Sequence, residues 1–221
     1  MEPVFFKTSD DVLIAGDYCR GKGRKGAILL HMMPATKSSW NKFAPFLVEK
    51  GLHVLAIDLR GHGVSDGGPD GYKDFTDHEH EASIKDVAAA VDFLKQKGVE
   101  EHNVVLVGAS IGANLAIAYM ALHHQIPAGV FLSAGTKYRG VDGLHAVKSI
   151  VAPRQLLFVT SKDDIGSYGS NYDMNVELMA KVREGVEKKL LVYSAAGHGT
   201  NMFGKEEPDL MKEILSWLEP R

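Results

Sequence analysis

The chain has a single cysteine, Cys19, among its 221 residues. One thiol excludes a disulfide within the chain, and such sparing use of cysteine is typical of proteins kept in a reducing compartment. The first residues, Met-Glu-Pro-Val-Phe-Phe-Lys, also lack the basic start and long apolar core of a secretion signal. We therefore expect a cytoplasmic protein.

Two kinds of partner are disfavoured by what else the sequence lacks. No apolar run approaches the roughly 18 residues that a membrane-spanning helix needs, so we expect no membrane span. Basic residues are not in excess: 25 Lys and Arg against 28 Asp and Glu give a net charge of -3 at pH 7. Because no basic cluster stands out either, we expect no nucleic acid partner.

What the sequence does contain is material for a core, since 45% of its residues are hydrophobic and no linker or internal repeat interrupts them. We therefore expect one globular domain over residues 1–221. Continuous Val-, Ile- and Leu-rich runs alternate with longer helical segments, which is typical of parallel strands covered on both faces. The predicted strands cover 27–31, 53–59, 104–109, 129–133, 156–160 and 190–193, after a hairpin over 4–7 and 12–18. The clearest predicted helices cover 79–97, 111–124, 175–183 and 206–218.

This alternation predicts an α/β fold, with a mostly parallel, doubly wound sheet of about eight strands. Residues 60–75 are rich in glycine and are expected to form a long loop. Residues 134–153 hold only a short helical stretch near 141–150. We therefore expect no sizeable cap domain.

Two stretches of the chain match the pattern Gly-x-Ser-x-Gly, at residues 108–112 and 63–67. The first follows a predicted strand and begins a predicted buried helix, so Ser110 would lie on a tight strand-to-helix turn with its hydroxyl exposed to a base. The start of that helix also supplies free N–H groups for an oxyanion. A helix-capping serine is the alternative at this position. Ser65 has neither neighbour and is interpreted as a loop serine.

A nucleophilic serine needs a base, and His198 lies between two glycines after the last predicted strand. His62, in the glycine-rich loop, is a weaker candidate. His78 and His80 lack the His-Glu-x-x-His spacing of a zinc site and are expected on a solvated face, so we expect no metal and no cofactor. The base in turn needs a carboxylate, which the end of the strand at 156–160 offers as Asp163 or Asp164.

The order of serine, acid and histidine is the order of the α/β-hydrolase fold, and the chain resembles that superfamily over nearly its whole length. The resemblance rests on four segments: residues 108–112, Gly197-His198-Gly199, Leu30-His31-Met32-Met33-Pro34, and the loop from Asp58 to Gly67. This last segment is similar to a structural Asp-x-Arg-Gly-His-Gly-x-Ser-x-Gly loop of monoglyceride-lipase-like and related serine esterases.

The resemblance also implies the remaining site residues. It favours Asp164 over Asp163 as the acid, because the family places a small residue three positions before the aspartate, and Ser161 stands there. It assigns the oxyanion hole to the backbone N–H groups of Met33 and Ile111. The chain departs from the family at Met32, where glycine is usual, and a side chain there could reshape the hole.

These residues predict a serine esterase that cleaves small to medium carboxylic esters through Ser110, His198 and Asp164. Apolar side chains on loops that could border the site favour an acyl or aryl group: Met32, Met33, Trp40, Tyr138, Met202 and Phe203. Lysophospholipase, monoacylglycerol lipase, thioesterase and acyl transfer to an alcohol remain alternatives. So does a catalytically silent ligand-binding protein of the same fold. The expected partner is a small ester substrate, and the sequence does not indicate an oligomeric state.

Overall fold

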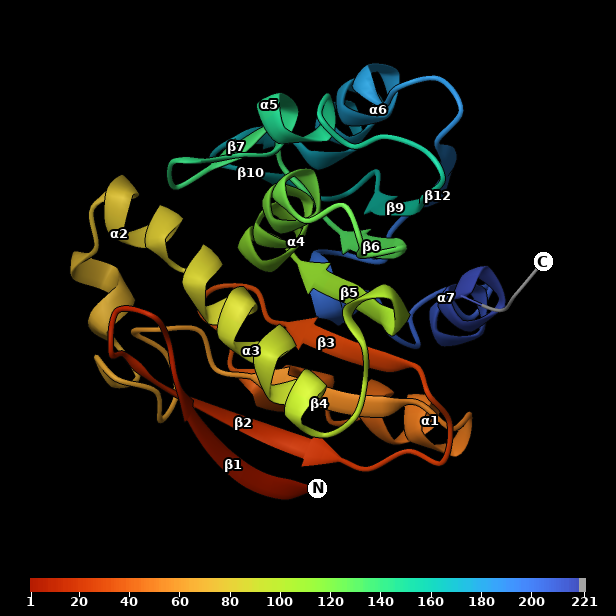
Figure 1. Ribbon diagram of the computed structural model, residues 1–221. Helices are drawn as coiled ribbons and strands as arrows, with labels where there is room; N and C mark the ends of the chain where they lie inside the picture. Colours follow the sequence, from red (N-terminus) through yellow and green to blue (C-terminus); the bar gives the residue numbers. More distant parts are fainter. Residues whose placement is uncertain (219–221) are drawn as a thin grey trace.

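The computed structural model describes residues 1–218, and an eight-stranded sheet runs through its centre (Figure 1). The strand order is β1-β2-β4-β3-β5-β6-β9-β12. The six strands from β4 to β12 in this order are parallel to one another, whereas β2 is antiparallel to both β1 and β4. The strands are β1 (Glu2–Lys7), β2 (Leu13–Cys19), β3 (Gly26–Leu30), β4 (His53–Ile57), β5 (Val104–Ala109), β6 (Ala128–Leu132), β9 (Gln155–Ser161) and β12 (Glu187–Tyr193). All eight predicted strands, including the antiparallel hairpin, are confirmed.

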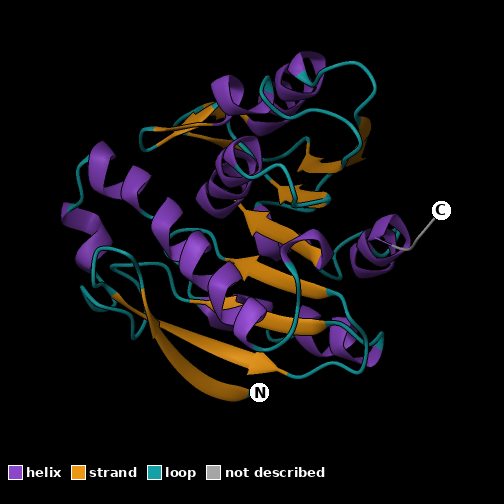
Figure 2. Ribbon diagram, in the orientation of Figure 1, coloured by secondary structure: helices purple, strands orange, loops and turns teal. Residues whose placement is uncertain are grey.

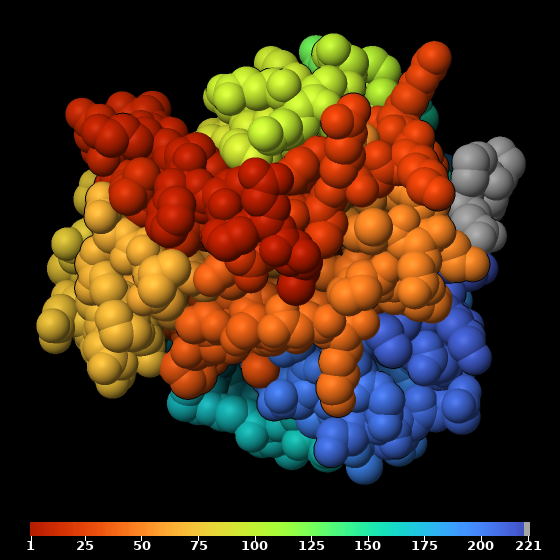
Figure 3. Space-filling view, turned by 90° about the horizontal axis from the view of Figure 1, so that it is seen from below, coloured from red at the N-terminus to blue at the C-terminus, as the bar shows by residue number. Residues whose placement is uncertain are grey.

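Helices cover both faces of this sheet, as Figure 2 shows. They are α1 (Phe43–Glu49), α2 (Asp77–Ala82), α3 (Ile84–Gln96), α4 (Ile111–Leu122), α5 (Gly143–Val147), α6 (Asn171–Lys181) and α7 (Leu210–Leu218). Residues of α3 to α6 share one apolar core with the sheet, and residues of α1 and α7 share a second core with the opposite face. Seen from below, the segment around α1 (orange) lies against the C-terminal region (blue) in Figure 3. There Phe203 stacks on Phe43, with ring centroids 5.1 Å apart.

Helix α4 is buried as its composition predicts. Leu115 and Ile117 are both fully buried, and the helix packs on β5 and β6 at the centre of the sheet. Burying each such side chain contributes roughly 1.5–3 kcal/mol. The helix that follows Ser110 is therefore held firmly, and its first turn is fixed relative to the strand ends.

The predicted helix over 79–97 is wrong in one respect, because it is two helices that meet at Ser83. The apolar face of α3 begins only at Ile84, so the residues before Ile84 do not extend that face into the core. Helix α2 instead begins with a capping box formed by Thr76 and Glu79. Its residue His80 packs at the end of the glycine-rich loop, with its ring 5.4 Å from that of Phe75.

The last helix begins at Leu210 rather than at 206. The carboxylate of Glu206 accepts hydrogen bonds from the N–H groups of Ser194 and Ala195, which ties it to the end of β12. Asp209 then caps the helix by accepting from Lys212 N at 3.1 Å. Helix α1 was not predicted.

The chain between the parallel strands forms two small hairpins in place of a large cap. They are β7 (Lys137–Tyr138) with β8 (Val141–Asp142), and β10 (Ile165–Gly166) with β11 (Gly169–Ser170). The short 3-10 turns are Lys37–Trp40, Gly71–Asp74, Glu101–Asn103 and Gly199–Met202. No sizeable cap interrupts residues 1–218, as predicted. Within that same range, no helix combines the length and hydropathy needed to cross a bilayer.

Candidate active site

The five residues predicted from the sequence surround one cavity at the carboxyl edge of the sheet. Met33 follows β3, Ser110 follows β5, Asp164 follows β9 and His198 follows β12. Together with Ile111 they line a cavity of about 380 Å³. Parallel strands end at a common edge, which is where open α/β sheets place their ligands.

Ser110 lies on a sharp turn between β5 and α4, with φ of +54° and ψ of -119°. A side chain on Gly108 would collide with the carbonyl oxygen of Gly112, and a side chain on Gly112 would collide with that of Leu30. The strand and the helix therefore approach too closely for any residue but glycine at these two positions. The Ser110 hydroxyl makes no capping hydrogen bond to α4, so helix capping does not account for this serine.

His198 and Asp164 form a hydrogen-bonded pair. The ring nitrogen Nδ1 lies 2.8 Å and 2.9 Å from the two carboxylate oxygens of Asp164, which is 9% exposed. Because the carboxylate accepts, Nδ1 carries the proton of this bond, and Nε2 is left as the basic atom of the neutral ring. Ser110 and His198 share the cavity, and the structure of residues 1–218 contains no hydrogen bond between them.

Asp163, the other candidate acid, binds a different group. Its Oδ1 accepts from the hydroxyl of Ser161 and, at 3.1 Å, from Gly197 N. The hydrogen bond from Ser161 holds the pKa of the Asp163 carboxyl below its ordinary value. Asp163 thus fastens the backbone of the histidine loop, whereas Asp164 contacts the imidazole.

Sequence reasoning missed Ser133, which lies directly after β6 at the same edge. Its fully buried hydroxyl donates to Asp164 Oδ2 at 2.8 Å and accepts from Gly199 N at 2.9 Å. One side chain thereby links the carboxylate to the loop that carries His198. Its position at the end of a strand-like run could have marked Ser133 as a candidate, but nothing in the sequence shows which way its hydroxyl points.

The predicted oxyanion hole has one N–H group at the start of α4 and one in the loop after β3. Ile111 is the first residue of α4, where backbone N–H groups have no carbonyl partner within the helix. The other loop is fixed by His31, whose Nδ1 donates to Met32 O at 2.9 Å and whose Nε2 accepts from Leu59 N at 3.0 Å. Burial lowers the pKa of His31 to about 4, which keeps the ring neutral as this bonding requires.

Met32, where the family pattern has glycine, does not line the cavity around Ser110. Its sulfur accepts a weak hydrogen bond from Thr200 Oγ1 at 3.9 Å, and a Cβ on Gly199 would lie 2.5 Å from it. The side chain therefore packs beneath the histidine loop, and it lines a second cavity of about 770 Å³ on the other side of that loop.

The second Gly-x-Ser-x-Gly match is structural. The buried Ser65 donates from Oγ to Asp58 O at 2.6 Å and accepts from Ala15 N at 2.9 Å. His62 is also buried, and its ring stacks on Tyr72 with centroids 4.2 Å apart. The loop interpretation of Ser65 is confirmed, and His62 does not reach the cavity.

Two expectations about side chains need correction. His80 was expected on a solvated face, but it is 2% exposed, since its ring packs beside that of Phe75. Of the apolar residues expected to border the site, Met33 and Tyr138 do so. Trp40 and Met202 instead lie in the core beneath α1 and α7, because the short turns that carry them fold inward. Phe203 packs in that core too and reaches only the second cavity.

Among the described residues, no group of three His, Cys, Asp or Glu side chains is placed to hold a metal ion.

A mostly parallel sheet, a strained serine turn and a histidine–carboxylate pair at its edge define a hydrolase of the α/β type. The model of the Alpha/beta hydrolase family matches residues 27–204. The chain therefore belongs to the alpha/beta hydrolase family.

Curated relatives match parts of the chain. It is 33% identical over 107 residues to monoacylglycerol lipase abhd6-A of Xenopus laevis, covering 47% of this chain and 29% of that protein. It is 34% identical over 97 residues to the bifunctional esterase/perhydrolase DCH of Acinetobacter calcoaceticus, covering 44% and 31%. It is 32% identical over 125 residues to the non-heme chloroperoxidase of Burkholderia pyrrocinia, covering 57% and 41%. The chain thus spans between 29% and 41% of the length of these relatives.

Solved structures match the fold as a whole. An esterase of Pyrococcus furiosus superimposes with a TM-score of 0.79 at 19% identity, covering 98% of this chain and 89% of that one. An esterase of Exiguobacterium antarcticum gives 0.76 at 16% identity, covering 98% and 99%. At these identities the likeness establishes the fold.

Proposed function

We propose that the protein is a serine esterase that cleaves carboxylic esters of small to medium acyl chains. The observation that carries the proposal is the meeting of two features at one cavity. Ser110 lies on a strained turn, and His198 is hydrogen-bonded through Nδ1 to Asp164 at 2.8 Å. A nucleophile, a base and a group that orients the base are the requirements of acyl transfer through a covalent intermediate.

In the proposed reaction, His198 Nε2 takes the proton of the Ser110 hydroxyl as its oxygen attacks the ester carbonyl. The backbone N–H groups of Ile111 and Met33 stabilise the resulting oxyanion. The imidazolium then protonates the leaving alcohol, and the C–O bond of the ester breaks. Water repeats the sequence on the acyl-enzyme, and Asp164 stays ionised throughout.

The cavity supports an ester substrate of modest size. Its volume is about 380 Å³, and Met33, Ile111, Tyr138 and Met174 give it apolar walls. A lysophospholipid, a monoacylglycerol or a thioester would use the same residues, and one relative is named a monoacylglycerol lipase. Water as the acyl acceptor is also part of the proposal; a relative named a bifunctional esterase/perhydrolase makes the acceptor a separate question from the residues. We keep the prediction of a cytoplasmic location, which rests on the use of a single cysteine in the sequence.

The test is replacement of Ser110 by Ala, with p-nitrophenyl esters of graded acyl length as substrates. Turnover should fall by roughly 10⁴-fold or more, because only binding and oxyanion stabilisation remain. Full activity of the variant would refute the proposal. A fluorophosphonate probe gives an independent reading: labelling should occur on Ser110, and absence of labelling would favour a silent ligand-binding protein.

A further inference from the structure

The cavity around Ser110 contains one charged side chain that the proposed mechanism does not use. Among its described lining residues, Arg139, Asp164 and His198 are the groups that can carry charge, and the last two are bonded to each other. Arg139 is exposed, and its guanidinium forms no ion pair or hydrogen bond within residues 1–218. The cavity therefore contains one cation without an ion pair, Arg139, together with the ionised carboxylate of Asp164, which is hydrogen-bonded to the neutral ring of His198.

Arg139 is held at this place by an unfavourable turn. It is the first of the two residues that join β7 to β8, with φ of +46°, and Gly140 follows with φ of +81°. Two positive φ angles are typical of a type I′ turn, in which Asn-Gly is preferred and an arginine is strained. A residue that breaks the local preference while facing a ligand cavity is a functional candidate.

The hairpin that carries Arg139 is held in place by hydrogen bonds from two buried asparagines. Asn114, in α4, donates to the carbonyl groups of Gly135 at 2.9 Å and Val141 at 3.0 Å. Asn171 donates to the hydroxyl of Tyr138 at 3.2 Å. The position of the hairpin relative to the serine turn is thus set by the same helix that begins at that turn.

The second hairpin, β10–β11, also borders the cavity. Tyr168, between β10 and β11, meets Tyr138 edge to face with centroids 5.1 Å apart. In Figure 1, β7 and β10 lie next to each other beneath α5 and α6. Tyr138 and Tyr168 thus form an aromatic pair in the wall of the cavity, and Arg139 is the charged residue next to Tyr138 in that wall.

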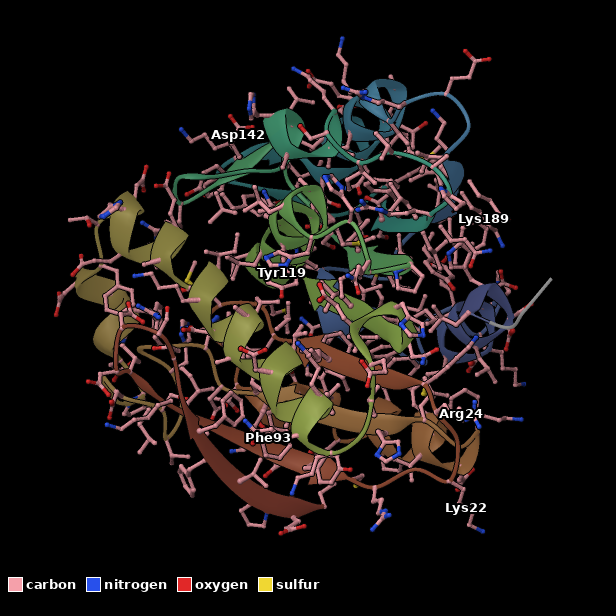
Figure 4. The ribbon with its side chains drawn as sticks, in the orientation of Figure 1. Lys22, Arg24, Phe93, Tyr119, Asp142 and Lys189 are labelled. Carbon is pink, nitrogen blue, oxygen red and sulfur yellow. The ribbon has the colours of Figure 1, made fainter. Side chains whose placement is uncertain are left out.

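Asp142, Glu81 and Asp77 are the acidic residues against this hairpin, and none of them forms an ion pair with Arg139 among the described residues. Asp142, labelled in Figure 4 where β8 leads into α5, caps that helix by accepting from His145 N at 2.7 Å. A Cβ on Gly140 would lie 2.8 Å from Glu81 Oε1, so this carboxylate lies against the turn backbone, and it forms no ion pair with Arg139 among the described residues. The guanidinium is left available for a ligand.

We propose that Arg139 selects esters that carry a carboxylate remote from the scissile bond. Guanidinium and carboxylate groups pair through two parallel hydrogen bonds, and a partly enclosed cavity strengthens that attraction. The inference rests on the proposed esterase function and names its substrate class: a monoanionic ester, with the charge on the acyl or on the alcohol part.

The experiment compares kcat/KM for matched esters that differ in charge. Mono-p-nitrophenyl adipate is paired with p-nitrophenyl hexanoate, and p-carboxyphenyl acetate with p-tolyl acetate. In Arg139→Asn, at least one anionic-to-neutral ratio should fall by about tenfold, the lower end of what a hydrogen bond to a charged group provides. Asparagine suits the positive φ, so the turn is kept while the charge is lost.

Two controls separate Arg139 from a general charge effect. Lys137→Ala removes a cation from the same hairpin at an exposed position outside the cavity lining, and it should leave both ratios at their wild-type values. Arg139→Lys should retain part of the preference. Added salt should lower the wild-type ratio and not that of Arg139→Asn, because screening acts on the charge pair.

Ratios that are equal in wild type and Arg139→Asn, with the neutral esters still hydrolysed, would overturn this inference and leave the esterase proposal intact. If the wild-type protein hydrolyses none of the four esters, the esterase proposal is refuted and the inference falls with it.

Discussion

The hydroxyl of Ser133 offers a test of how the proposed base is positioned. Ser133→Ala removes the bond to Asp164 at 2.8 Å and leaves the buried N–H of Gly199 without its partner at 2.9 Å. An orphaned buried N–H costs about 1–3 kcal/mol, and a bond to a charged group is worth about 1.5–3 kcal/mol. We expect the free energy of unfolding to fall by about 3 kcal/mol, which corresponds to a decrease in Tm of roughly 6–12 °C.

The effect on catalysis should be separable from the effect on stability. With both Asp164 and the histidine loop less fixed, kcat for a p-nitrophenyl ester should fall by about 10–100-fold with little change in KM. Ser161→Ala is the matched control, because that hydroxyl donates to Asp163 and accepts from Ala196 N at 2.8 Å. It should lower Tm comparably and kcat much less. Equal losses of kcat in the two variants, or full activity of Ser133→Ala, would refute the reasoning.

Two further predictions concern the acid and the oxyanion loop. Asp164→Asn should lower kcat by about 10⁴-fold and Asp163→Asn far less; the reverse order in steady-state assays would assign the acid to Asp163. Burial lowers the pKa of His31 from 6.5 to about 4, so between these pH values the unfolded chain binds a proton that the folded chain does not. His31 alone therefore lowers the free energy of unfolding by roughly 3 kcal/mol as pH falls through that window. Burial raises the pKa of Asp86 to about 6, which acts in the opposite direction, so the measurement is the difference between wild type and His31→Gln in urea unfolding. That difference should shrink from about pH 7 to about pH 4, and a constant difference would contradict the prediction.

The sheet and the placement of the site residues could be predicted because both follow from local patterns. Each buried strand is a continuous apolar run, and the residues after β5, β9 and β12 must meet where parallel strands end. Ser110, Asp164 and His198 are therefore brought to one edge by strand order alone. No distance between atoms was needed to expect them there.

What the sequence could not predict depends on contacts between distant segments. Strands of two residues, such as Lys137–Tyr138, have no hydrophobic period to recognise. The bond from Ser133 to Asp164 joins residues that are 31 positions apart, and its donor could equally have faced solvent. His80 is buried beside the ring of Phe75, and the charged sequence around it does not indicate this contact.

Backbone strain in this protein gathers around the proposed site. Within residues 1–218 four residues other than glycine have positive φ: Asp11, Ser110, Ser133 and Arg139. Three of the four belong to one site. Ser110 is the proposed nucleophile, Ser133 binds the proposed acid, and Arg139 is the cation in the cavity wall. Each costs about 1–2 kcal/mol, a cost that a chain selected for stability alone would avoid by placing glycine or asparagine there. The glycines beside Ser110 and the buried asparagines that bind the hairpin of Arg139 hold these strained conformations in place. We therefore take the strain as evidence that the geometry of the cavity, rather than stability, determines which residue occupies each of these three positions.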